Sequence, residues 1–137
     1  MSKEKMVRVE EVMQSDFDLM DGRLTVKEAL LSMKHPKTRA LVIAKRHEDD
    51  EFGIVLLSDI AKKVIAADRS PERVNLYEIM AKPVISVPLR MQIRYCARLL
   101  ENFSIAIAPV IDEGKVWGII SYDDLVLRGL MRNFDET

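Results

Sequence analysis

Cysteine and histidine are scarce in this sequence, and their scarcity excludes several kinds of site. The single cysteine, Cys96, cannot form a disulfide bond within a chain of 137 residues. Two histidines and one cysteine argue against a structural zinc site, which takes four such ligands. Neither histidine has a serine or cysteine partner in a local motif, so no catalytic triad is indicated. We therefore expect no catalytic residues and no metal ligands.

Long apolar runs and an excess of charge are also missing. No apolar run approaches the length of a membrane span, and the start of the chain lacks the apolar core of a signal peptide. Lys and Arg number 21 against 22 Asp and Glu, and the net charge of -1 argues against a surface built for phosphate backbones. The composition, 48% hydrophobic and 31% charged, is typical of a globular protein. We expect a cytoplasmic protein that binds neither a membrane nor nucleic acid.

Two similar stretches organise the rest of the chain. Residues 53–60 read Gly-Ile-Val-Leu-Leu-Ser-Asp-Ile, and residues 118–125 read Gly-Ile-Ile-Ser-Tyr-Asp-Asp-Leu. Each has a glycine, a run rich in β-branched residues, and an aspartate six positions after the glycine, with a helical pattern following. In each copy a strand ends and an aspartate lies at the start of a helix, where it caps free N–H groups or faces a ligand. One supersecondary unit is therefore used twice.

The spacing of other residues supports a duplication. Matching positions are separated by 67 residues for Met13 and Met80 and for Val26 and Ile93, by 68 for Ala40 and Ala108, and by 65 for Gly53 and Gly118. The spacing changes only between predicted elements, as expected for a structural repeat whose insertions fall in loops. We predict one repeat over residues 9–67, a second over residues 75–131, and a linker over residues 68–74.

Each repeat is predicted to contain the same elements in the same order. In the first repeat we expect a helical turn at 9–13, a strand at 17–20, a helix from Thr25, strands at 40–44 and 52–57, and a helix at 58–67. In the second we expect a turn at 76–80, a strand at 84–87, a helix at 91–102, strands at 108–111 and 116–121, and a helix at 123–131. Thr25 and Glu28 fit the capping box that begins a helix.

These motifs resemble a pair of CBS motifs, the arrangement known as a Bateman module. The first copy rests on Glu11-Val12-Met13, Val42-Ile43 and the stretch from Gly53 to Asp59; the second rests on Glu78-Ile79-Met80, residues 108–112 and residues 118–125. The resemblance implies an α/β (α+β) fold of tandem βαββα repeats, packed sheet to sheet with pseudo-two-fold symmetry around two clefts. It also implies a homodimer.

The resemblance further implies a ligand site. CBS clefts often bind adenosine-type ligands such as AMP, ADP, ATP or S-adenosylmethionine, whose ribose hydroxyls are held by the aspartate six residues after the glycine. A hydroxyl residue three positions after the glycine donates toward phosphate. The second copy has both, as Asp124 and Ser121, and Ile119 lies on the same strand. By resemblance, Thr38 and Arg39 from the first repeat complete this cleft.

The other cleft is expected to be weaker. It has Asp59 and Ser58, but Leu56 stands where the hydroxyl residue is needed, and the matching segment Ala106-Ile107 offers no polar side chain. The two aspartates also have a simpler explanation, because each could serve only as a helix cap.

We therefore predict a stand-alone regulatory module, not an enzyme, with no obligatory cofactor. It would bind an adenosyl ligand near Asp124 and signal to an unknown regulated protein. The alternative is a ligand-free module that acts by dimerisation and partner docking, with vestigial clefts.

Overall fold

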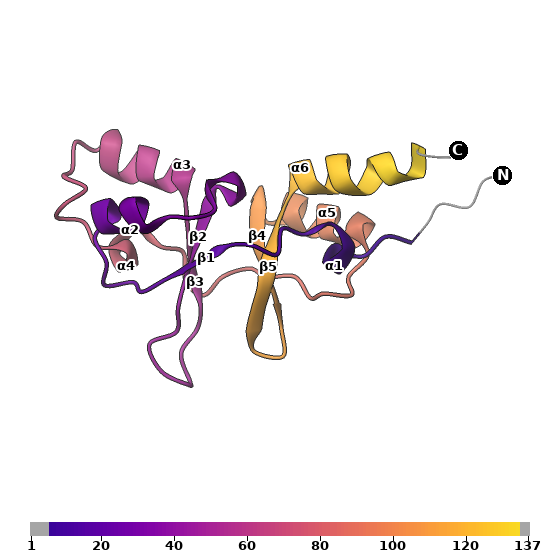
Figure 1. Cartoon of the computed structure of the whole chain (residues 1–137), viewed down its shortest axis with the longest axis horizontal. Helices are drawn as coiled ribbons and strands as arrows, with labels where there is room; N and C mark the ends of the chain where they lie inside the picture. The colour runs from indigo at the N-terminus through magenta and orange to yellow at the C-terminus, as the bar shows by residue number, and fades with distance from the viewer. Residues whose placement is uncertain (1–5, 135–137) are drawn as a thin grey trace. The chain divides into compact units, whose positions relative to one another are not determined.

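The computed structural model describes residues 6–134, which form two compact units (Figure 1). Unit 2 runs from Asp16 to Val84, and unit 1 combines the residues up to Ser15 with those from Ile85 onward. Each unit has its own buried apolar core. In the part of the chain described, no helix has the length and apolar character needed to cross a membrane.

Unit 2 contains a three-stranded sheet in the order β1-β2-β3. Strand β1 (Asp18–Met20) runs parallel to β2 (Ala40–Ile43), which pairs in an antiparallel manner with β3 (Gly53–Leu56). All four residues of β2 are buried, as its continuous apolar run predicts for a central strand. The helical elements are α2 (Val26–Ser32), the 3₁₀ turn η1 (Pro36–Thr38), α3 (Leu57–Ile60) with its π-helical continuation η2 (Ala61–Ile65), and α4 (Leu76–Ile79).

The start of α2 confirms the predicted capping box. The Glu28 N–H donates to Thr25 Oγ1 at 3.1 Å, and the Thr25 N–H donates to Glu28 Oε1 at 2.9 Å. Each side chain therefore satisfies a backbone N–H that would otherwise lack a partner in the first turn.

Unit 1 contains a two-stranded antiparallel sheet. Its strands are β4 (Ile107–Asp112) and β5 (Lys115–Ser121). Its helical elements are α1 (Val9–Val12), α5 (Ile93–Asn102), α6 (Tyr122–Asp124) with its π-helical continuation η3 (Leu125–Gly129), and the 3₁₀ turn η4 (Leu130–Phe134). In both units the closing helix widens into a π-helix directly after its first turn.

The helical turn that begins each repeat packs in the unit formed by the other repeat's sheet. Figure 1 shows α1 beside α5 and α4 beside α2, although these elements are far apart in the sequence. The Val9 N–H donates to the Met91 carbonyl at 2.8 Å, and the matching Leu76 N–H donates to the Leu24 carbonyl at 2.9 Å. The apolar side chains of α1 and α4 are buried in the cores of units 1 and 2 respectively.

The leading turns α1 and α4 are thus exchanged between the two repeats. The backbone after each of these turns forms hydrogen bonds with the edge of a strand. Gln14 and Ile119 exchange two backbone hydrogen bonds of 2.8 and 2.9 Å, and Ala81 and Ile54 exchange two of 3.0 and 2.9 Å. The sequence repeats and the compact units therefore have different boundaries. The predicted boundaries of 9–67 and 75–131 describe the repeat along the chain, whereas each folded unit takes its first turn from the other repeat.

This pairing explains the glycine that opens each motif. A Cβ atom added at Gly118 would lie 2.5 Å from the Gln14 carbonyl oxygen, which is backbone and cannot easily move. A Cβ atom added at Gly53 would lie 2.7 Å from the Met80 sulfur and 3.3 Å from the Ala81 oxygen. The flexible methionine leaves more room for adjustment at Gly53 than at Gly118.

The predicted strand at residues 84–87 is wrong, because only a single bridge forms there. Val87 donates to the Pro109 carbonyl at 3.1 Å and accepts from the Ile111 N–H at 3.0 Å. The next bond of a parallel ladder would run from the N–H of residue 109 to the carbonyl of Ile85. Proline has no N–H, so the ladder stops after one rung, and the described residues of unit 1 contain no counterpart of β1.

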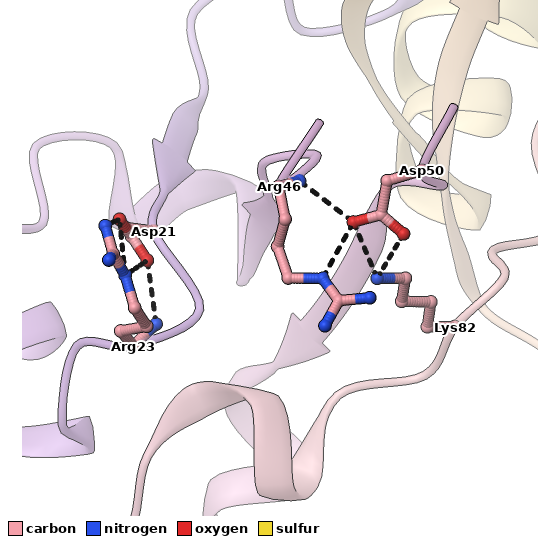
Figure 2. A network of polar contacts seen from close by, with 5 residues as sticks. All are labelled: Asp21, Arg23, Arg46, Asp50 and Lys82. Atoms are coloured by element: carbon pink, nitrogen blue, oxygen red, sulfur yellow. Dashed lines mark hydrogen bonds and ion pairs between the residues drawn. The ribbon is translucent and has the colours of Figure 1, made fainter. Parts of the chain in front are cut away.

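A charged clamp holds the loop between β2 and β3 against the end of unit 2 (Figure 2). Asp50 accepts bonds from the Arg46 N–H at 2.9 Å and from Arg46 Nε at 3.1 Å, and its two oxygens lie 2.7 and 2.9 Å from Lys82 Nζ. The Asp50 side chain is only 7% exposed. The hydrogen bond from Lys82, followed by the one from the Arg46 backbone, holds the pKa of Asp50 well below its usual range.

We predict that Gly118→Ala lowers the free energy of unfolding by about 1–3 kcal/mol, because the new methyl group forces the backbone of residue 14 away from β5. Gly53→Ala is expected to cost less. Gly114→Asn is the control, since the hairpin turn at Gly114 has open space and asparagine tolerates its positive φ. Urea unfolding of the three variants measures how much each lowers the free energy of unfolding, and so gives their order. Equal costs at residues 118 and 53 would contradict it.

The clamp also predicts a pH dependence. A carboxylate whose pKa is lowered in the folded state stabilises the fold above its unfolded pKa of about 3.9, and this contribution is lost as the pH falls below that value. Asp50→Asn should therefore lower the urea midpoint at pH 7 and make a smaller difference at pH 3. Asp49→Asn, an exposed change of the same charge in the same loop, serves as the control. A decrease in the urea midpoint of Asp50→Asn that is the same at pH 7 and pH 3 would refute the prediction.

Candidate ligand-binding site

Asp124 lies at the start of the closing helix of unit 1 and is 5% exposed. The Ser121 N–H and the Ser121 hydroxyl each donate to Asp124 Oδ2 at 3.0 Å, and the Asp124 N–H donates back to the hydroxyl oxygen at 3.3 Å. This is a capping box in which aspartate takes the place of the usual glutamate. The box fixes the direction of the carboxylate, and the capping role predicted as the simpler explanation is present.

The second oxygen of Asp124 is held less tightly. Gln14 Nε2 lies 3.3 Å from Asp124 Oδ1, and Arg128 Nη1 lies 4.0 Å from it. An ionised carboxylate oxygen accepts up to two hydrogen bonds, so Oδ1 retains capacity for a further donor. The site therefore combines a fixed carboxylate with one oxygen whose present contacts are long.

Gln14 and Arg128 were missed by the sequence analysis. Arg128 follows Asp124 by four residues on a helix, a spacing that places two side chains on one face and was available as a signal. No sequence pattern indicates Gln14, because its approach depends on the exchange of the leading turns. Ile119, predicted as part of the site, is a buried residue of β5 whose backbone pairs with Gln14.

The Asp59 position in unit 2 forms only half of this arrangement. The Leu56 N–H donates to Asp59 Oδ2 at 2.9 Å, but leucine has no hydroxyl to complete the box. Ser58, the other residue predicted here, is exposed. The hydrogen bonds around the two aspartates therefore differ, because Leu56 stands where the other copy has the hydroxyl of Ser121.

Thr38 and Arg39 lie in unit 2, at the end of η1 and before β2. Thr38 is 2% exposed, and its hydroxyl lies 3.0 Å from the His35 carbonyl and 3.1 Å from the Ala40 carbonyl, so it bonds within its own turn. Arg39 is exposed and has a left-handed backbone with φ of 59°. A contribution of these two residues to a ligand site with Asp124 stays a prediction.

Comparison with known proteins identifies the family. The family model for the CBS domain matches residues 76–129. The solved hexameric CBS-CP12 protein from bloom-forming cyanobacteria is 35% identical, with a TM-score of 0.87, over 96% of this chain and 76% of that one. The chain belongs to the CBS domain family. The predicted tandem CBS architecture and the mixed α/β fold are confirmed.

Two other proteins are similar to most of this chain. An uncharacterised protein of Methanopyrus kandleri is 28% identical over 121 residues, which are 88% of this chain and 61% of that protein. The chain thus spans about three fifths of that relative. A CBS domain pair solved in complex with 5′-methylthioadenosine and S-adenosyl-L-methionine is 22% identical, with a TM-score of 0.74, over 89% of this chain and 94% of that one. At this identity the likeness shows the fold.

Proposed function

We propose that this CBS domain pair is a regulatory module that binds an adenosyl ligand through Asp124. The observation that carries the proposal is the geometry of this carboxylate, which is buried, held on one oxygen by Ser121, and weakly engaged on the other. The vicinal hydroxyls of a ribose are donors suited to such an oxygen. The related CBS pair bound to S-adenosyl-L-methionine and 5′-methylthioadenosine supports this ligand class.

Other predicted residues take separate roles in the proposal. Ser121 keeps the carboxylate in place and, by rotating its hydroxyl, donates toward a ligand. Arg39, an exposed residue, provides charge-assisted bonds to phosphate in AMP, ADP or ATP. Thr38 shapes the turn that presents Arg39, because its hydroxyl bonds to the backbone. The half-formed site at Asp59 binds the same ligands more weakly or not at all.

The proposed role is regulatory and not enzymatic. Asp124 bonds to Ser121 and to Gln14, and no histidine lies among the side-chain hydrogen-bond partners of Asp124 and Ser121 in residues 6–134. Ligand binding would shift an equilibrium between states of the module by its differential affinity for them. The partner that responds to this change of state is a regulated protein in the cytoplasm.

We predict that at least one of AMP, ADP, ATP and S-adenosylmethionine binds in calorimetry, and that Asp124→Asn weakens binding about tenfold or more. The loss corresponds to about 1.4 kcal/mol or more, as expected when hydrogen bonds to a charged group are removed. Asp59→Asn is the matched control and should change the affinity little. Arg39→Ala should weaken the phosphorylated ligands more than S-adenosylmethionine.

Thermal melting of each variant separates loss of binding from loss of folding. Binding that survives Asp124→Asn in a folded variant would rule out the site. A folded wild-type protein that binds none of the four ligands would instead favour the ligand-free interaction module.

We also propose that the module self-associates through its closing helix. Apolar side chains recur on the exposed surface of η3 and η4, which form the end of unit 1: they are Val126, Leu127, Leu130, Met131 and Phe134. Contiguous exposed apolar surface of this kind marks interaction sites in soluble domains. The hexameric state of the CBS-CP12 relative supports self-association, and we propose a homodimer as the basic assembly.

Sedimentation equilibrium tests this assembly. The double variant Leu127→Glu and Met131→Glu should convert the dimer to a monomer, because two carboxylates would be buried without partners in the interface. Leu31→Glu, a change at a leucine of α2 in unit 2 that is still more exposed than Leu127 and Met131, is the control and should leave the dimer intact. A monomeric wild-type protein, or a dimer unaffected by the double change, would count against the surface.

A further inference from the structure

A cavity of about 690 Å³ lies entirely within unit 2, apart from the predicted adenosyl site. It contains none of the residues predicted to bind an adenosyl ligand. Its walls come from the turn after β1, the end of β2, the loop between β2 and β3, and α4 with the segment after it; they are Asp21, Gly22, Arg23, Ile43, Ala44, Arg46, Glu51, Tyr77, Met80, Lys82 and Pro83. This size lies within the range of small-molecule sites.

The floor of this cavity is apolar. Ile43 belongs to the core of unit 2, and Met80 packs against that core. Tyr77, in α4, has 55% of its surface exposed. The backbone at Tyr77 is held against the turn after β1, because the N–H of Tyr77 donates to the Gly22 carbonyl at 3.0 Å. A Cβ atom added at Gly22 would lie only 3.1 Å from Ile43, so glycine there keeps the wall close to the floor. A flat or branched apolar group fits against this surface.

Most charged groups around the cavity neutralise one another. Lys82 is bound to Asp50, and Arg23 is bound to Asp21 at 2.7 Å (Figure 2). The hydrogen bond from the Arg23 side chain lowers the pKa of Asp21 to about 2, so this carboxylate stays ionised. These pairs leave little net charge to attract a ligand with several negative charges.

Two charged groups on the rim keep unused bonding capacity. Arg46 engages Asp50 through Nε, and within residues 6–134 its two terminal nitrogens have no bonding partner, with the side chain 75% exposed. The carboxylate of Glu51, five residues further along the same loop, has no side-chain partner within residues 6–134. The rim therefore offers one free guanidinium edge and one free carboxylate above an apolar floor.

We propose that this cavity binds a free α-amino acid with a large apolar side chain. The ligand carboxylate accepts two parallel bonds from the terminal nitrogens of Arg46, the pairing that guanidinium geometry favours. Its ammonium group donates to Glu51, and its side chain packs on Tyr77 and Ile43. A zwitterion matches a rim of balanced charge, whereas a nucleotide would bring several negative charges against Glu51 and Asp21.

Calorimetry with L-phenylalanine, L-leucine and L-methionine tests the proposal on the whole chain. At least one should bind. Phenylalanine amide, which lacks the carboxylate, and N-acetylphenylalanine, which lacks the ammonium, should each bind at least tenfold more weakly than phenylalanine. Glu51→Gln should weaken phenylalanine and leave N-acetylphenylalanine unchanged, and Tyr77→Ala should weaken both.

Two controls separate this site from other effects. Glu48→Gln removes the same charge from the same loop outside the cavity wall, and Asp124→Asn alters the proposed adenosyl site and the helix cap in unit 1, away from the cavity wall; both should bind phenylalanine as the wild type does. Arg46→Gln also removes a hydrogen bond to Asp50, so its melting temperature is measured to separate loss of folding from loss of binding. Glu51→Gln, which leaves the bonds between Lys82 and Asp50 in place, is measured beside it. Absence of binding by all three amino acids, or equal affinity for phenylalanine and its two blocked forms, would overturn the proposal.

Discussion

The backbone bonds that join Gln14 to Ile119 and Ala81 to Ile54 are the constraint on which both units depend. They place the segment after each exchanged turn along the edge of a strand, and they bring it close enough that only glycine fits opposite. They also bury α1 in the core of unit 1 and α4 in the core of unit 2. In unit 1 the same bonds carry the Gln14 side chain to the carboxylate of Asp124.

Asp124 combines a structural role with the binding role that we propose for it. One oxygen caps the helix with Ser121, and such a cap is worth about 1 kcal/mol to the fold. The other oxygen makes only long contacts. A residue can therefore stabilise the helix start and hold a ligand, because the two roles use different oxygens. At Asp59 the leucine at position 56 removes part of the cap and the predicted phosphate donor together.

The sequence predicted well where a pattern is local. The buried run at β2, the capping box at Thr25 and the order of elements in both repeats follow from residue spacing, and the resemblance to CBS motifs follows from the repeat. Residues 84–87 were predicted as a strand from their own composition, whereas the deciding residue, Pro109, lies on the neighbouring strand. The exchange of the leading turns joins residues far apart in the sequence, such as Val9 and Met91, and the contact of Gln14 with Asp124 spans 110 positions. No short pattern indicates either. The cavity beneath the Asp50 clamp likewise depends on side chains from four segments.

The crossing of the two leading turns also determines how the chain can be divided. A polypeptide cut at the boundary between the repeats would give two fragments, each with a sheet but with the wrong helical turn attached. The fragment carrying β3 would lose Leu76 and Ile79 from its interior, and the fragment carrying β5 would lose Val9 and Val12. Each repeat therefore lacks, within its own sequence, the helical turn that completes the core around its sheet.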